Sequence, residues 1–336
     1  MQVNLGIVGV GDFGRMHIQA LKQNPEVQII AVCSRTEEKL KSVCEEYKIP
    51  AWYTDVDAFL KHPHLDGVII ATGEDTHYPF TRKAVEQGKH VLLEKPVCLT
   101  KEDAGRLLAL NKTTPSVILP GHILRYDSAY NQAKQALEET QAGEIQSIRV
   151  KRNVPVERFS LHSRTHPVFM ALAHDIDIIL WLTGSQAKRV FAMEKKTKPE
   201  FENPDIVFAL AELENGVVCS LETQWRLPNE YGRYLDTELE VMTSKGNVKL
   251  QTPGNALQTM FLGCQTGYDV TLWPEVCGKM TGALVNEEQH FVDLILGRCR
   301  KPVVTVEEAV KGVTMAQMIL ESCKTKMPVW RGEEEL

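Results

Sequence analysis

The feature that most constrains the fold is a glycine motif that directly follows a short apolar run. Residues 3–10 read VNLGIVGV, and the motif GxGxxG comprises Gly9, Val10, Gly11, Asp12, Phe13 and Gly14. In a strand–turn–helix unit the three glycines permit a tight turn, close approach of a pyrophosphate and close helix–strand packing. The helix N-terminus adds free N–H groups for the phosphates. The pattern predicts that these six residues line a dinucleotide; a glycine-rich turn without a ligand is the alternative.

Apolar runs and helical patterns alternate through the first 122 residues. Expected strands cover 3–10, 27–33, 65–72, 89–94 and 117–119, and helical patterns cover 14–23, 37–47, 78–87 and 102–110. Near-continuous Val, Ile and Leu runs are typical of strands buried on both faces. Strands separated by helices favour right-handed crossovers and a parallel sheet. We therefore expect residues 1–122 to form a doubly wound Rossmann domain, which makes the protein an α/β protein.

The pattern changes after residue 122. A strand is expected at 145–152 and a helix at 166–182, ended by Gly184. Two hairpins follow, 206–213 with 217–223 around Asn215-Gly216, and 234–243 with 248–251 around Lys245-Gly246. Helices at 287–296 and 307–323 close the chain. The prediction for 123–336 is an α+β domain with a mostly antiparallel sheet that is open on one face.

Composition narrows the range of partners. The net charge is -6, and no block of Lys and Arg stands out, which argues against nucleic acid and anionic membrane surfaces. No apolar run approaches the roughly 18 residues of a membrane span, and the first residues lack the pattern of a secretion signal. The eight cysteines are scattered without metal-binding spacing. We expect a cytoplasmic protein with reduced thiols, no metal and a small-molecule substrate.

The end of the second expected strand bears on the choice of cofactor. An acidic residue about twenty positions after the glycine motif would bind the ribose 2′-hydroxyl of NAD. This chain has Ser34 and Arg35 there, and the next acids are Glu37 and Glu38. A guanidinium matches the oxygens of a 2′-phosphate, so NADP is favoured, with NAD as the alternative. Arg35 stacked on adenine or lying in water is the other interpretation.

Two further segments carry candidate chemistry. Glu94-Lys95-Pro96 ends the fourth expected strand, and ligands of open α/β sheets bind beyond the carboxyl ends of strands. His174, Asp177 and Trp181 share one face of the helix at 166–182. A surface lysine and a buried His–Asp pair are the structural alternatives.

These motifs together resemble the Gfo/Idh/MocA oxidoreductase family, which includes inositol, glucose-type and nucleotide-sugar dehydrogenases. The resemblance covers nearly the whole chain and is carried by the glycine motif with His17, by Glu94-Lys95-Pro96, by His174, Asp177, Trp181 and Gly184, and by shorter matches such as Ala71-Thr72, His77, Gly121-His122 and Gly143. The family fold is a Rossmann domain followed by a domain built on a mostly antiparallel sheet.

The resemblance implies roles for particular residues. Lys95 matches a lysine that binds a substrate hydroxyl and assists proton transfer, and His174 matches a proposed general acid/base. Many members have Asp where this chain has Met170, which places inositol-dehydrogenase-like chemistry in question. The nicotinamide is expected near Thr72 and Lys95, with His77 and Glu94 also at the cofactor. Expected substrate contacts are Lys95, Arg125, Tyr126, Arg164, His166 and His174.

The resulting hypothesis is an NAD(P)-dependent oxidoreductase, preferring NADP(H), that acts on a secondary alcohol or ketone of a sugar, cyclitol or nucleotide sugar. A homo-oligomer, dimer or tetramer, is expected. Two alternatives stay open, a non-catalytic NAD(P)-binding sensor and an NAD-dependent glycosidase of the same family. Both Lys95 and His174 are present, which argues against the sensor, whereas Met170 argues for it.

Overall fold

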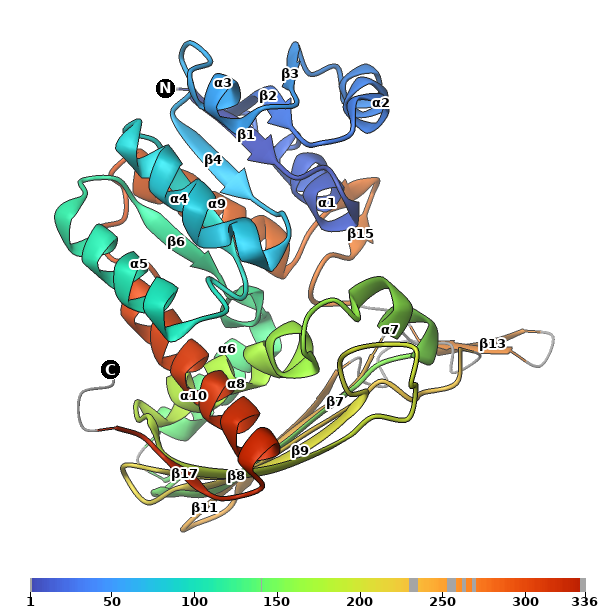
Figure 1. Cartoon of the computed structure of the whole chain (residues 1–336), viewed down its shortest axis with the longest axis vertical. Helices are drawn as coiled ribbons and strands as arrows, with labels where there is room; N and C mark the ends of the chain where they lie inside the picture. Colours follow the sequence, from blue (N-terminus) through green and yellow to red (C-terminus); the bar gives the residue numbers. More distant parts are fainter. Residues whose placement is uncertain are drawn as a thin grey trace. The chain divides into compact units, whose positions relative to one another are not determined.

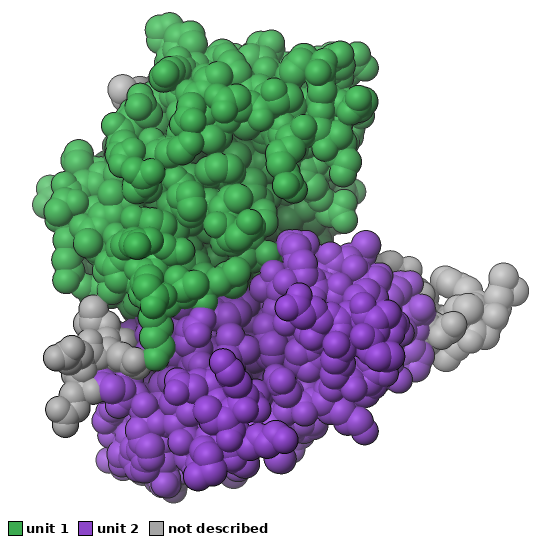
Figure 2. Space-filling model, in the orientation of Figure 1, with its two compact units in different colours: residues 1–126, 272–310 green, residues 127–271, 311–336 purple. Residues whose placement is uncertain are grey.

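The computed structural model describes residues 2–139, 141–229, 235–252, 258–261, 264–267 and 270–332. The chain forms two compact units, coloured green and purple in Figure 2. The first contains Met1–Tyr126 and Leu272–Val310, and the second contains Asp127–Thr271 and Lys311–Leu336. The two units therefore do not coincide with the expected domains 1–122 and 123–336. The reason is that a late helix returns to the first unit, where Phe291 and Val292 join its apolar core.

The first unit is built on a six-stranded parallel sheet with the order β3-β2-β1-β4-β5-β6 (Figure 1). This is the strand order of a doubly wound Rossmann sheet, so the expected fold class is confirmed. The strands are β1 Val3–Val8, β2 Val27–Cys33, β3 Ala51–Tyr53, β4 Gly67–Ile70, β5 His90–Glu94 and β6 Ile118–Gly121.

Helices flank this sheet. They are α1 Asp12–Leu21, α2 Glu37–Tyr47, α3 Val56–Leu60, α4 His77–Glu86, α5 Lys101–Thr113 and α9 Ala283–Ile295, with short 3-10 turns η1 Glu74–Thr76 and η2 Ile123–Tyr126. α5 begins where the sequence indicates, because the Thr100 side chain accepts a hydrogen bond from the Asp103 N–H at 3.1 Å. A small hairpin, β15 Glu275–Val276 with β16 Lys279–Met280, precedes α9.

The second unit is built on a seven-stranded sheet with the order β12-β11-β7-β10-β9-β8-β17. Its strands are β7 Ile145–Asn153, β8 Ala187–Lys195, β9 Ile206–Leu213, β10 Val218–Gln224, β11 Asp236–Thr243, β12 Asn247–Thr252 and β17 Val329–Trp330. Only β7 and β10 pair in parallel within this sheet, so the expected mostly antiparallel sheet is confirmed. Tyr234, placed in a strand by the sequence, lies outside the described residues. Strands β13 Gln258–Phe261 and β14 Cys264–Gly267 form a separate hairpin.

Helices cover one face of the second sheet (Figure 1). They are α6 Ser128–Glu138, α7 Val156–His162, α8 Ala173–Thr183 and α10 Val306–Thr325. A π-helical turn at Val168–Leu172 leads into α8, which ends at Gly184 in the left-handed region with φ 60°. α10 lies on the sheet, because the Ala192 N–H of β8 donates to the Ser322 hydroxyl at 2.8 Å.

Two features are absent from the described residues, a membrane-spanning helix and a metal-binding cluster. None of the helices in those ranges is long and apolar enough to span a membrane. Within the same ranges, no group of three or more His, Cys, Asp or Glu side chains is arranged to hold a metal ion.

Candidate functional site

The turn between β1 and α1 has the shape that a dinucleotide cradle requires. Gly9 has φ +100°, and a Cβ there would lie 2.1 Å from the Ala71 carbonyl oxygen. A Cβ on Gly14 would lie 2.0 Å from the Gly9 oxygen. A Cβ on Gly11 would meet no atom of the described residues within 4 Å. Only Gly11 therefore faces open space, which is where a pyrophosphate would approach the backbone.

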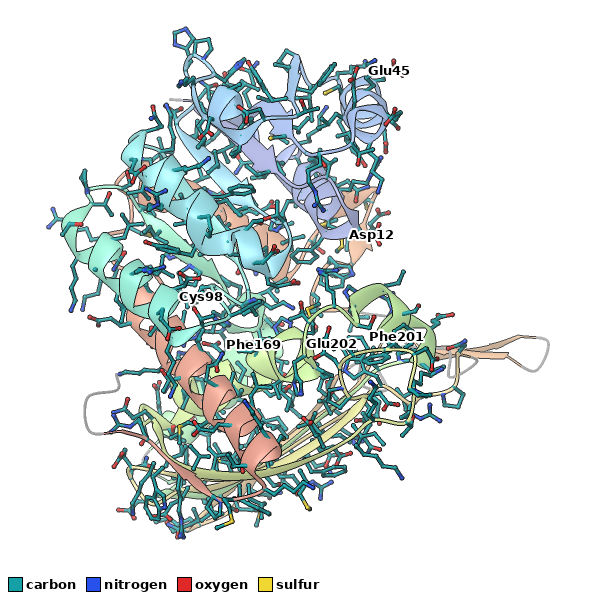
Figure 3. The ribbon with its side chains drawn as sticks, viewed as in Figure 1. Asp12, Glu45, Cys98, Phe169, Phe201 and Glu202 are labelled. Carbon is teal, nitrogen blue, oxygen red and sulfur yellow. The ribbon has the colours of Figure 1, made fainter. Side chains whose placement is uncertain are left out.

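The start of α1 adds donors to this cradle. Gly11 is the N-cap residue and, as a glycine, has no side chain that could cap the helix. Asp12, labelled in Figure 3, is exposed in the first turn, Phe13 is half-buried and Val10 is buried. The first N–H groups of the helix thus keep their capacity to bind a ligand's phosphate oxygens. These residues fit an NAD-type cofactor.

Other expected cofactor residues lie at the same sheet edge, because the carboxyl ends of parallel strands meet there. Ser34 follows β2 and donates its N–H to the Tyr53 oxygen at 3.1 Å, and Arg35 beside it is exposed. Thr72 follows β4, and its hydroxyl lies 2.7 Å from that of Thr76. Lys95 follows Glu94, the last residue of β5. The fold thus brings the glycine motif, the Ser34-Arg35 pair and the Lys95 segment to one edge.

His77 connects two loops at this edge. It is buried, with Nδ1 2.7 Å from the Pro96 carbonyl oxygen and Nε2 3.2 Å from that of Thr72. Burial lowers the pKa of His77, so the ring is neutral near pH 7 and donates to one of the two carbonyls. These contacts tie the loop after β4 to the loop after β5. Cofactor binding by His77 itself stays a prediction.

A buried polar cluster lies beneath the Lys95 segment. His17 of α1 has Nε2 3.2 Å from Glu94 Oε1 and Nδ1 2.9 Å from Glu288 Oε1. Glu94 Oε2 accepts the Lys95 N–H at 3.1 Å. Glu287 is fully buried, and neither of its carboxylate oxygens has a hydrogen-bond partner within the described ranges. We call His17, Glu94, Glu287 and Glu288 the His17 cluster.

Electrostatics within the His17 cluster are strongly perturbed. Burial lowers the pKa of His17, but the hydrogen bonds to Glu288 and Glu94 outweigh it and raise the pKa to about 10. Burial raises the pKa of Glu288 to about 7 and that of Glu287 well above its ordinary value. Sequence patterns do not predict this cluster, because His17 and Glu288 are 271 positions apart.

In the second unit, His174 lies partly exposed on α8. Its neighbour Asp175 is buried and accepts two hydrogen bonds from Arg152 of β7, at 2.7 Å from Nε and 3.0 Å from Nη2. Tyr130 is buried beside them, and burial raises its pKa to about 12. The paired Arg152 and Asp175 fix α8 on the sheet. His174 projects about 100° away from Asp175 around the helix axis, because neighbouring residues of an α-helix are offset by that angle.

Met170 occupies an apolar environment near the start of α8. It packs against a cluster that contains Phe159, Ala171 and Trp225. Methionine has no ionisable group, so Met170 cannot transfer a proton.

The remaining expected substrate residues have their own contacts. Arg125 is buried and donates to the Val303 oxygen and Glu308 Oε1, at 3.2 and 3.0 Å. The Tyr126 carbonyl accepts from Asn286. His166 Nε2 lies 3.0 Å from Glu194 Oε2.

The expected substrate residues are divided between the units. Lys95, Arg125 and Tyr126 belong to the first unit. Arg164, which is exposed, belongs to the second with His166 and His174. The structure describes each unit by itself, so the convergence of these side chains on one substrate stays a prediction.

Known proteins resemble this chain over most of its length. The scyllo-inositol 2-dehydrogenase (NAD(+)) of Bacillus subtilis is 24% identical over 336 residues, covering 98% of this chain and 96% of that protein. The inositol 2-dehydrogenase/D-chiro-inositol 3-dehydrogenase of Shouchella clausii is 28% identical over 258 residues, covering 74% of this chain and 72% of that protein.

Solved structures share the fold. The myo-inositol 2-dehydrogenase of Lactobacillus plantarum superposes with a TM-score of 0.87 at 22% identity, covering 99% of this chain and 100% of that one. The scyllo-inositol dehydrogenase of Lactobacillus casei, solved with NAD(H) and scyllo-inositol, gives 0.85 at 22% identity, covering 98% and 99%.

Family assignments cover both halves of the chain. Residues 3–122 match the family described as "Oxidoreductase family, NAD-binding Rossmann fold", and residues 130–249 match the "GFO/IDH/MocA C-terminal domain". Together these matches span well over half of the sequence. The protein therefore belongs to the Gfo/Idh/MocA family of NAD-binding oxidoreductases.

Proposed function

We propose that the protein is a dehydrogenase that oxidises a secondary alcohol of a cyclitol or a related sugar, or reduces the corresponding ketone. The observation that carries the proposal is the open space at Gly11, on the same sheet edge as Lys95. The named activities of the similar proteins point to inositols as the substrate class. A cofactor cradle beside a lysine is the arrangement that such a reaction needs.

The proposed roles follow from position. Gly9 to Gly14 would hold the pyrophosphate, and Thr72 and Lys95 would lie near the nicotinamide. The bound cofactor supplies a hydride acceptor or donor at C4 of its ring. Lys95 holds the substrate hydroxyl and takes its proton, and His174 acts as the second acid/base. Met170 leaves these two residues without the carboxylate that many relatives carry.

The preference for NADP over NAD is part of the proposal. Arg35 is exposed directly after β2, where its guanidinium is available to a 2′-phosphate. The similar Bacillus subtilis protein is named as an NAD(+) enzyme, and NAD is the alternative for this chain.

A homo-oligomer formed through the second sheet is also proposed. Met193, Phe208 and Leu210 are exposed on the face opposite the helices, at 63%, 43% and 57%. Large apolar side chains gathered on one sheet face are typical of a protein–protein contact.

A substrate screen tests the proposed function. Inositols, simple sugars and nucleotide sugars would be incubated with NAD+ and with NADP+, and reduced cofactor would be followed by absorbance. We expect turnover of at least one cyclitol or sugar. Cofactor binding with no turnover of any compound would favour the sensor, which Met170 already makes the second candidate. Net hydrolysis of an aryl glycoside would favour the glycosidase.

A further inference from the structure

We propose that the His17 cluster biases the cofactor site toward the oxidised, positively charged form of the nicotinamide. The inference rests on the proposed cofactor site at Gly11 and Lys95. Three residues of the cluster, His17, Glu287 and Glu288, have no other role in the proposed reaction, and the fourth, Glu94, is an expected cofactor residue. The inference assigns His17, Glu94, Glu287 and Glu288 the task of setting the relative affinity for the two redox forms.

The first step is the charge of the cluster. Two carboxyl groups, those of Glu288 and Glu94, each face one ring nitrogen of His17. The buried carboxyl of Glu287 lies within the electrostatic field of these three groups. Only an imidazolium donates from both nitrogens to two carboxylates. With Glu287 protonated, the His17 cation faces the carboxylates of Glu94 and Glu288, and the cluster carries one net negative charge. The pKa of Glu288 is raised to about 7, so a proton bound there neutralises the cluster, and the negative charge is fully present only above that pH.

The second step is that this charge is held in a dry environment. His17, Glu287 and Glu288 are at most 2% exposed, and Glu94 is 5% exposed. The charges acting on Glu287 come from Glu94, His17 and Glu288. Counterions and water screen a buried charge far less than an exposed one. The field of the cluster therefore extends into its surroundings.

The third step connects the cluster to the cofactor edge. One Glu94 oxygen faces His17, and the other accepts the N–H of Lys95. Gly121 of β6 packs on the same carboxylate, since a Cβ there would lie 2.8 Å from Glu94 Oε1. The negative charge is thus fixed at the end of β5, directly before the lysine expected at the nicotinamide.

The fourth step is the difference between the two ligands. Oxidised nicotinamide carries a positive ring charge, and the reduced ring is neutral. The phosphates, and the charge on Lys95, are the same for both forms. A nearby negative charge therefore stabilises the bound oxidised form relative to the bound reduced form. Contacts that both forms make cancel in the ratio of the two dissociation constants, so this ratio reports the effect of the charge.

The experiment measures that ratio. Dissociation constants for the oxidised and reduced forms of NAD and of NADP would be obtained by calorimetry at about pH 8.5, above the raised pKa of Glu288, on the full-length protein. The double variant Glu94→Gln with Glu288→Gln removes the two carboxyl groups that face His17 while nearly keeping side-chain volume. The single variant Glu288→Gln is measured as well, in case the double variant does not fold. Glu45→Gln, an exposed residue on α2 labelled in Figure 3, is the control for net charge.

We expect the double variant to lose preference for the oxidised form by about threefold to tenfold, the size of a unit charge acting at intermediate dielectric. The single variant should shift in the same direction, and Glu45→Gln should leave the ratio unchanged. An unchanged ratio in folded double and single variants would overturn the inference alone. If the native protein bound neither form, the proposed function would fall and the inference with it.

Discussion

Strand β4 is buried at all of its positions, whereas strand β9 alternates between buried and more exposed residues along its length. The parallel sheet is covered by helices on both faces, so its strands read as unbroken apolar runs. The second sheet is covered on one face, so Phe208 and Leu210 remain exposed between buried neighbours. A doubly covered sheet offers ligands only its edge, and the candidate cofactor site lies there. A sheet covered on one side offers a whole face.

The two regions also hold their candidate chemical groups differently. Lys95 follows a parallel strand and is linked through its backbone to the buried His17 cluster. His174 lies on a helix that the ion pair of Arg152 and Asp175 fastens to the sheet. Under the proposed function, the first region combines cofactor binding with chemistry, and the second contributes chemistry without cofactor binding.

The largest expected effect separates these two contributions. Lys95→Ala and His174→Ala should each lower kcat by roughly 10²–10⁴-fold on the true substrate, the usual cost of removing a positioned acid or base. Steady-state kinetics and cofactor titration would be run on both variants. Cofactor affinity should survive in His174→Ala because the histidine belongs to the second unit. Full activity in both variants would contradict the assigned roles.

The second effect contrasts two glycines of one motif. Gly11→Val should weaken cofactor binding by roughly a hundredfold, about 2.7 kcal/mol, because the new side chain would fill the open space at the cradle. Its melting temperature should stay near the native value. Gly14→Val is the matched control, since its Cβ would lie 2.0 Å from the Gly9 oxygen and should destabilise the fold. Normal cofactor binding by a folded Gly11→Val protein would refute the placement.

The third effect concerns the end of β2. Arg35→Ala should remove most of the preference for NADPH over NADH, at a cost of roughly 1.5–3 kcal/mol for a lost charge-assisted hydrogen bond. Fluorescence titration of both cofactors would measure it, with Lys39→Ala as a control for an exposed cation on α2. Equal affinity for both cofactors in the native protein would show that Arg35 has no such role.

The fourth effect is a pH dependence of stability. The pKa of Glu287 is raised in the folded protein, so folding takes up a proton between the pKa of the unfolded state and that of the folded state. The stability that this carboxyl contributes is fully present below its unfolded-state pKa. It is lost as pH rises through its folded-state pKa. The slope is at most about 1.4 kcal/mol per pH unit for one proton. Between pH 5 and pH 9 the melting temperature should therefore fall more steeply for the native protein than for Glu287→Gln. Parallel slopes would count against a protonated Glu287.

The smallest effect on chemistry is expected at the open sheet face. Replacing Phe208 and Leu210 together by Ser should reduce the molecular mass in solution, measured by light scattering, and leave cofactor affinity unchanged. Leu161→Ser, at an exposed apolar residue of α7, is the control. A native protein that is already monomeric would remove the basis for this surface as an interface.

Local patterns predicted much of the fold. The helix Glu37–Tyr47 and the strands Val27–Cys33 and Ile206–Leu213 match their expected bounds, because periodicity and flanking turns act over a few residues. β3 was missed because Ala51–Tyr53 is only three residues long and incompletely buried. α6 and β8 were also missed, although each has an ordinary length.

Long-range partners were beyond the reach of the sequence pattern. The glycine motif and Lys95 each directly follow an apolar run that indicates a strand. Their positions at the ends of strands could therefore be predicted. Glu288 reaches His17 only because α9 returns to the first unit. The same holds for Arg152, whose ion pair with Asp175 depends on how α8 crosses β7.

The most direct test of the central claim is hydride transfer from carbon. An inositol carrying deuterium at its carbinol carbons would be incubated with the protein and oxidised cofactor, and the recovered cofactor would be analysed by mass spectrometry and NMR. The account predicts one deuterium on C4 of the reduced nicotinamide and a ketone in the cyclitol, with both signals lost in Gly11→Val. Cofactor that stays bound and unlabelled, with cyclitols, sugars and nucleotide sugars alike, would contradict it.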